Sequence, residues 1–260
     1  MKHPIFSMLY LALIGLFFCC TSDIEPSIPK VQFPPPFNGT IFLDPDILTP
    51  TDPSTFTGLT YAGQAKRKMF DRRVNDWITT TPFLFKANYK DGLSIELQVN
   101  PEFKTVAEAE IQALKYAEVI GQLPSVLRKD VKTSWIHLGT QPFGGGNNNL
   151  LIHIGQSAVY EKEGILEETL IHEAAHTSLD AAHASSKGWI NAQNTDPSFI
   201  STYAFDNPRR EDIAETFLLY VALRYRSDRI SASLRDKILE TVPTRIKYFD
   251  SQNFNMHPIK

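Results

Sequence analysis

Apolar positions follow a two-residue period in the first half of the chain and a helical period in the second half. Residues 83–100, FLFKANYKDGLSIELQVN, alternate apolar and polar side chains on both sides of Asp91-Gly92, which predicts a β-hairpin. The short apolar runs SWIHLG (134–139) and LLIHIG (150–155) predict two further strands. GGGNNN (144–149), which lies between these runs, favours a flexible hairpin.

Five segments space their apolar residues as helices do. We expect helices at 64–78, 105–124, 166–179, 208–225 and 231–248. Gly121 and Pro124 are the expected stops of the second helix. Because strands come first and helices later, the pattern predicts an α+β fold.

The first twenty residues have the pattern of an export signal. Lys2 precedes an apolar run that ends near Phe18, and this run is too short for a comfortable membrane span. Cys19 and Cys20 follow it, as in a bacterial lipoprotein signal. We therefore expect an exported protein that is lipid-anchored at the cell envelope, with a plain secreted protein as the alternative.

Prolines crowd residues 21–56 and predict an extended tether, whose later part could lie on the domain. Residues 57–260 are expected to form a single globular domain. The formal net charge is −3, so we expect neither a nucleic-acid partner nor an anionic membrane surface, and membrane contact only through the lipid. The sequence leaves the oligomeric state open.

ETLIHEAAHTSLDAAH (168–183) contains three of the seven histidines. His172, Glu173 and His176 spell H-E-x-x-H, and residues four apart lie on one face of a helix. Both imidazoles can therefore bind one Zn²⁺, and Glu173 can take a proton from a water that the metal activates. A surface helix with satisfied histidines is the plainer alternative.

A catalytic zinc needs a third protein ligand. His183 is near in sequence, but it lies one position beyond the metzincin spacing and lacks the glycine turn, so we expect it to line or flank the cleft. Glu211 and Glu215 are a stronger pair, because they share a face of the helix expected to start at Asn207-Pro208. First-turn acids that favour the helix dipole are the alternative.

H-E-x-x-H followed by E-D-I-A-E (211–215) resembles the gluzincin metallopeptidases, especially lethal-factor-type catalytic domains. The resemblance covers about residues 164–220. It implies a zincin-like domain with a small N-terminal sheet, a helical C-terminal half and a peptide or protein substrate. It also implies Glu211 as zinc ligand, Glu215 as outer-shell residue and Tyr203 as donor to the reacting carbonyl oxygen.

Two further residues have open roles. Asp180 could hold a ligand histidine from behind, or it could end its helix. His153 is a candidate cleft residue if its strand is the edge strand that pairs with substrate, whereas a core or surface histidine is the favoured alternative. Two other functions compete with a peptidase: a surface binding lipoprotein with a structural zinc, and a zinc hydrolase of non-peptide amides.

Overall fold

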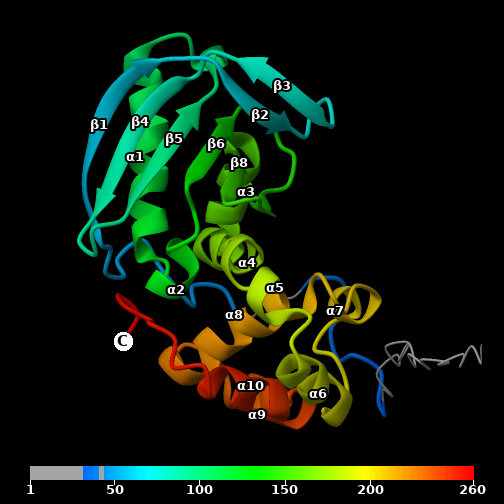
Figure 1. The fold of residues 1–260 in the computed structure, drawn as a ribbon. Coiled ribbons are helices and arrows are strands. Elements are labelled where there is room, and N and C mark those ends of the chain that lie inside the picture. The colour runs from blue at the N-terminus through cyan, green and yellow to red at the C-terminus, as the bar shows by residue number, and fades with distance from the viewer. Residues whose placement is uncertain (1–31, 41–43) are drawn as a thin grey trace, which may run out of the picture.

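The computed structural model describes residues 32–40 and 44–260, and these form a strand-rich half above a helical half (Figure 1). The expected α+β organisation is confirmed at this level, since the strands precede most of the helices. Among the described residues, no helix is long and apolar enough to cross a bilayer. The expected signal at 1–20 lies outside the described residues.

A six-stranded mixed sheet has the order β1-β4-β5-β6-β8-β7. Its strands are β1 (Phe56–Gln64), β4 (Phe83–Tyr89), β5 (Ser94–Val99), β6 (Thr133–His137), β7 (Gly144–Gly146) and β8 (Asn149–His153). The β4–β5 hairpin confirms the prediction, and Gly92 has the positive φ of 83° that its turn requires. The two predicted strands are also confirmed, as β6 and β8, which pair in parallel.

GGGNNN forms a hairpin, as predicted, at the edge of this sheet. β7 pairs antiparallel with β8, and Asn147 and Asn148 both adopt positive φ, 51° and 56°, in the two-residue turn. Asparagine tolerates this conformation, and two such residues suit the twist of a hairpin. The edge strand is therefore β7, whereas β8 lies between β6 and β7.

The helix expected at 64–78 is wrong. This segment forms a separate hairpin of β2 (Arg67–Asp71) and β3 (Asp76–Thr80). Met69 packs with Trp135 and Leu151 in a small second core. Packing against these two residues of the main sheet therefore favours a hairpin over a helix for this segment. The spacing of the apolar residues also fits a helix, but tertiary packing can outweigh such a local preference.

Ten α-helices and one 3₁₀-helix belong to the described residues. They are η1 (Pro101–Phe103), α1 (Val106–Gln122), α2 (Ser125–Arg128), α3 (Ile154–Glu163), α4 (Leu166–Ser178), α5 (Asp180–His183), α6 (Lys187–Thr195), α7 (Thr202–Asp206), α8 (Asp212–Tyr225), α9 (Ala232–Thr241) and α10 (Pro243–Asp250). α1 and α4 confirm the predicted helices, and the Thr105 hydroxyl caps α1 by accepting the Glu108 N–H.

The bounds of one predicted strand and two predicted helices need correction. The segment that begins at Ile154 is α3, not a continuation of a strand. α8 starts at Asp212 rather than Pro208, because residues 208–211 form a turn. The helix expected at 231–248 is two helices that meet at Pro243, since proline lacks the N–H that a continuous helix would use there.

α4 lies at the centre of the molecule. It packs against β7 and β8 on one side and against α8 on the other (Figure 1). Leu170, Ile171, Ala174 and Ala175 are fully buried in the main core, and the small alanines allow close packing. The helix that carries H-E-x-x-H therefore joins the two halves.

Residues 44–56, predicted as the end of the tether, pack against the folded domain. Ile47 and Leu48 are 0% and 1% exposed, and the Leu48 N–H donates to Glu168 Oε1 over 2.9 Å. The Thr55 N–H donates to the Gly121 carbonyl of α1 over 2.9 Å. These residues therefore belong to the core.

Candidate metal centre

The two histidines of the motif meet on one face of α4. His172 Nε2 and His176 Nε2 are 3.2 Å apart, and the ring planes are nearly perpendicular. His172 is 5% exposed, so its ring is removed from bulk water. This arrangement follows from the four-residue spacing, since residues one helical turn apart project to the same side.

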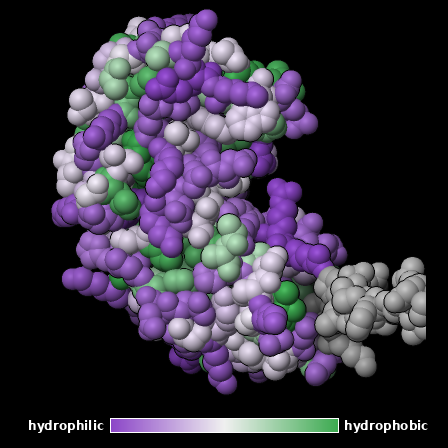
Figure 2. Space-filling view, in the orientation of Figure 1, coloured by the Kyte–Doolittle hydropathy of each residue, from purple (hydrophilic) through white to green (hydrophobic). Residues whose placement is uncertain are grey.

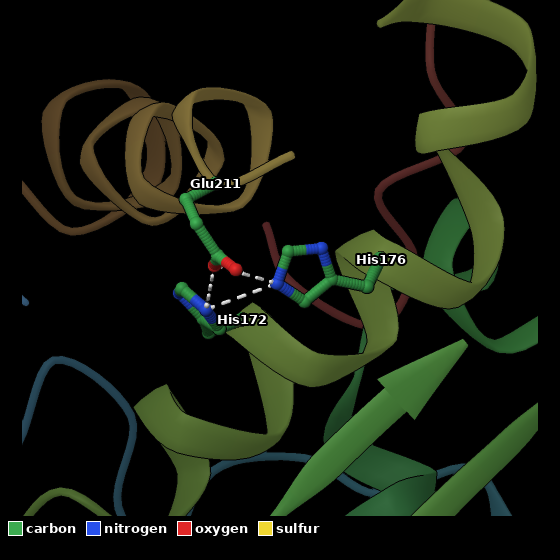
Figure 3. A group of neighbouring side chains, drawn as sticks. All are labelled: His172, His176 and Glu211. Carbon is green, nitrogen blue, oxygen red and sulfur yellow. Dashed lines mark hydrogen bonds and ion pairs between the residues drawn. The ribbon is translucent and has the colours of Figure 1, made fainter. Parts of the chain in front are cut away.

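Glu211 completes the group from the N-terminal end of α8 (Figure 3). Its Oε2 lies 3.1 Å from His176 Nε2 and 3.4 Å from His172 Nε2. The carboxylate is 2% exposed. The packing of α8 on α4 thus brings Glu211 to two histidines that precede it by 35 positions or more in sequence.

The geometry of the three donor atoms fits a tetrahedral zinc ion. Zinc–nitrogen and zinc–oxygen bonds of about 2.0–2.1 Å at tetrahedral angles place neighbouring ligand atoms about 3.3–3.4 Å apart. The three separations here are 3.1, 3.2 and 3.4 Å. Two imidazoles and one carboxylate are also a donor set that zinc accepts in catalytic sites.

Acidic residues stand behind both histidines. Asp180 Oδ2 lies 2.9 Å from His176 Nδ1, and Glu215 Oε1 lies 3.6 Å from His172 Nδ1. The Ser201 hydroxyl donates to Glu215 Oε2 over 2.7 Å, which orients that carboxylate. Such outer partners hold a ligand imidazole in position and raise its basicity.

The surroundings favour positive charge at the centre of this group. Burial acts to lower the pKa of His176, but hydrogen bonds with Asp180 and Glu211 outweigh it and raise that pKa to about 10. Burial acts to raise the pKa of Glu211, but hydrogen bonds with both histidines bring it well below its usual range. A site that stabilises a cation between these side chains suits a divalent metal.

A cavity of about 370 Å³ opens onto the three residues. Glu173 and Tyr203 both line it, so the structure brings the two residues that the sequence associates with reaction chemistry to the same space. Burial, followed by the charge of Glu211, raises the pKa of Tyr203 to about 12, so its hydroxyl stays protonated at neutral pH. Figure 2 shows this side of the molecule hollowed between the β2–β3 hairpin and α7.

The edge strand β7 forms one wall of the cavity through Gly145 and Gly146. A Cβ at Gly145 would lie 1.8 Å from the Glu173 carbonyl oxygen, so only glycine allows this approach. The Gly146 N–H donates to the Thr177 hydroxyl over 2.8 Å, which fastens the strand to α4.

Two sequence candidates lie away from the cavity. His153, a possible cleft residue, is 0% exposed and is stacked on His137 in the protein interior, because its strand is not at the edge; this agrees with the alternative of a core histidine. His183 hydrogen-bonds through Nδ1 to the Tyr248 hydroxyl at 2.6 Å and lines a different cavity. Neither residue lines the cavity of the three-residue group, so the expected position of His183 beside that cavity is corrected.

The cavity also contains residues that the sequence did not indicate. Arg72 comes from the β2–β3 turn, Tyr160 from α3, and Thr40 from the N-terminal segment. The Gly39 carbonyl next to Thr40 accepts the Tyr203 N–H at 3.3 Å. No local motif marks these residues, since they reach the site only through the fold.

Comparisons with protein-family models, with curated proteins and with solved structures find no match for this chain. The assignment of a function therefore rests on the geometry and chemistry of the site.

Proposed function

We propose that the protein is a zinc-dependent peptidase of the gluzincin type, with a zincin-like domain. The observation that carries this proposal is the convergence of His172, His176 and Glu211 to within 4.8 Å of one another, with Glu173 in the same cavity. A structural zinc site has no use for a free carboxylate beside its ligands, whereas a hydrolytic site requires one.

His172, His176 and Glu211 would hold the zinc, and Asp180 and Glu215 would fix the two imidazoles from behind. Zinc in this position would supply Lewis-acid chemistry, acidifying water and polarising a carbonyl group. Glu173 accepts the proton of the attacking water at its carboxylate and passes it to the departing amine. Tyr203 donates a hydrogen bond from its hydroxyl to the oxygen on which negative charge develops.

The substrate backbone has a natural partner in β7. An edge strand offers unpaired N–H and C=O groups to which an extended peptide can add as a further strand. Because β7 contacts α4 at Glu173, a peptide alongside it would bring a carbonyl close to the metal cluster. This favours a peptide bond over a non-peptide amide.

A structural zinc site remains the second hypothesis, in which a surface protein keeps the metal for stability. It would use a fourth protein ligand. Among the described residues, the metal-binding group contains three. The three residues all line the same open cavity.

The decisive experiment combines metal analysis with peptide cleavage on the purified protein. We expect one zinc per chain and cleavage of members of a peptide library, with both lost when a chelator removes the metal. Zinc that is retained with no cleavage of any peptide would favour the structural site. The protein must include residues 44–56, which pack into the core.

We also propose that the protein is exported and anchored by a lipid at Cys19 or Cys20. The support is the apolar run that ends at these cysteines. Metabolic labelling with a fatty acid should tag the parent protein, and a Cys19→Ser/Cys20→Ser variant should stay unlabelled. An unlabelled parent released to the medium would indicate a plain signal peptide.

A further inference from the structure

Arg72 lies in the turn between β2 and β3, and its neighbours hold that turn firmly. The Arg73 guanidinium donates to Asp71 Oδ2 over 2.7 Å and to Glu102 Oε2 over 2.6 Å. The Asp71 carboxylate also accepts the Arg73 backbone N–H over 2.9 Å. Both flanking residues are thus fixed on one side of the turn, while Arg72 lines the cavity of the metal cluster.

The Arg72 guanidinium is placed against the first residue of the edge strand. Its Nη2 lies 2.8 Å from the position that a Cβ would take at Gly144, and its Cζ lies 3.5 Å from it. A side chain at 144 would therefore displace the guanidinium. Glycine at this position gives Arg72 the space to lie beside β7, where an extended substrate would bind.

Arg72 is a cation of the cavity that forms no ion pair within residues 32–40 and 44–260, and the Glu173 carboxylate lines the same cavity. Asp180 is engaged with His176, and Glu211 with both histidines. Arg210 forms an ion pair with Glu211 Oε1 at 3.2 Å and is 78% exposed at its side chain. Arg72, by contrast, is half-buried and makes neither a hydrogen bond nor an ion pair with a described residue.

A guanidinium that lines a cavity and makes no hydrogen bond or ion pair with a described residue has N–H donors that a ligand can use. Its planar fork matches a carboxylate, which it binds through two parallel hydrogen bonds. We propose that Arg72 selects substrates by binding a carboxylate of the peptide, from an acidic side chain or from a free C-terminus. This inference rests on the proposed peptidase function and names the substrate class of that site.

The test measures binding rather than turnover. Zinc-loaded Glu173→Gln protein is titrated with alanine-based hexapeptides that carry Glu or Gln at each position in turn, with either a free or an amidated C-terminus. We expect the best carboxylate peptide to bind about 10–100-fold more tightly than its neutral counterpart, as charged hydrogen bonds allow. A preference for Glu over Gln identifies a side-chain carboxylate, and a preference for the free acid identifies the C-terminus.

Arg72→Met, made in the same background, keeps the apolar stem and removes the charge, so the preference should disappear while neutral peptides bind as before. Gly144→Ala keeps the charge but crowds the guanidinium, so it should weaken the preference. Arg235→Met removes an exposed arginine of α9 and should leave the preference intact.

Two results would overturn the inference. One is a panel in which no carboxylate peptide binds more tightly than its neutral counterpart. The other is a preference that survives in Arg72→Met. Neither result depends on hydrolysis, so the inference can fail while the parent protein cleaves peptides, and it can hold while cleavage fails.

Discussion

Glu173 is next to a predicted zinc ligand, lines the cavity and is not part of the metal cluster. Its carboxylate is therefore available for proton transfer. Glu173→Gln keeps the shape of the side chain but removes the basic oxygen. We expect zinc binding and thermal stability near those of the parent, and hydrolysis lower by at least about 100-fold.

Tyr203→Phe removes one donor to the developing oxyanion and should cost about 10–10³-fold in kcat/KM. Zinc content, thermal melting and kcat/KM are measured together on both variants. Parental hydrolysis by zinc-loaded Glu173→Gln would exclude the proposed mechanism and favour a structural zinc.

The identity of the third zinc ligand can be tested by comparing Glu211 with His183, the two candidates that the sequence offers. Glu211→Ala removes a carboxylate within 3.4 Å of both histidines, so zinc affinity should fall by at least about 100-fold, beyond the usual effect of an outer-shell change. His183→Ala should leave zinc affinity unchanged, because His183 bonds to Tyr248 instead. Zinc titration against a competing chelator measures both, and the opposite ranking would refute the assignment.

At the scale of elements, the contact between β7 and α4 sets the position of Glu173, the proposed general base. Gly145→Ala would force a Cβ into the backbone of Glu173, so β7 or α4 would have to shift. We expect a loss of about 1–3 kcal/mol in the free energy of unfolding, as for other overpacked sites, together with lower hydrolysis. Gly58→Ala in β1 is the matched control, since a Cβ there meets no atom within 4 Å. Thermal melting of both variants measures the difference. Equal melting temperatures would contradict the close approach of β7 to α4.

The N-terminal segment and α4 are joined through Glu168, and this link makes stability depend on pH. Burial raises the pKa of Glu168 to about 8, although the Leu48 N–H acts in the opposite direction. The folded protein thus holds the proton that the unfolded chain releases near its ordinary pKa of 4.5. The contribution to stability is complete below that value and is lost as pH rises towards 8.

Glu168→Gln stays neutral at every pH and can still accept the Leu48 N–H. We expect the variant to be more stable than the parent at pH 8 by at least about 1 kcal/mol, and the difference to vanish near pH 4. Urea unfolding across this range measures it. Glu240→Gln, at an exposed position, should follow the parent. A pH-independent difference would show that Glu168 does not titrate with folding.

At the scale of the whole molecule, the cavity depends on chain that precedes the strand-rich half. Removing residues 1–56 would expose the sites of Ile47 and Leu48, each worth about 1.5–3 kcal/mol when buried. It would also remove Gly39, whose carbonyl accepts the Tyr203 N–H. We expect protein that begins at residue 57 to melt at least about 10 °C lower or to aggregate, whereas protein that begins at residue 32 should melt like the parent. Equal melting temperatures for the two shortened proteins would show that residues 32–56 act only as a tether.

Local periodicity was sufficient for much of the fold and for the centre of the site. His172 and His176 share a helical face because of their spacing alone, and Glu211 and Glu215 because of theirs. The β4–β5 hairpin follows from alternation around Asp91-Gly92. These features depend on residues that are close together in the sequence, so the sequence determines them directly.

Tertiary packing decided the rest, because the deciding contacts join residues that are distant in sequence. Residues 67–80 form a hairpin since Met69 packs on Trp135 and Leu151, although their own spacing also suits a helix. The edge position went to β7 and not to the strand of His153, which only the order of the sheet could reveal. Arg72 lines the cavity and His183 lies outside it, because contacts between elements that are distant in sequence determine both positions. The helical repeat of α4 places the two histidines of the candidate site on one face, but the packing of α8 is needed to bring Glu211 to them.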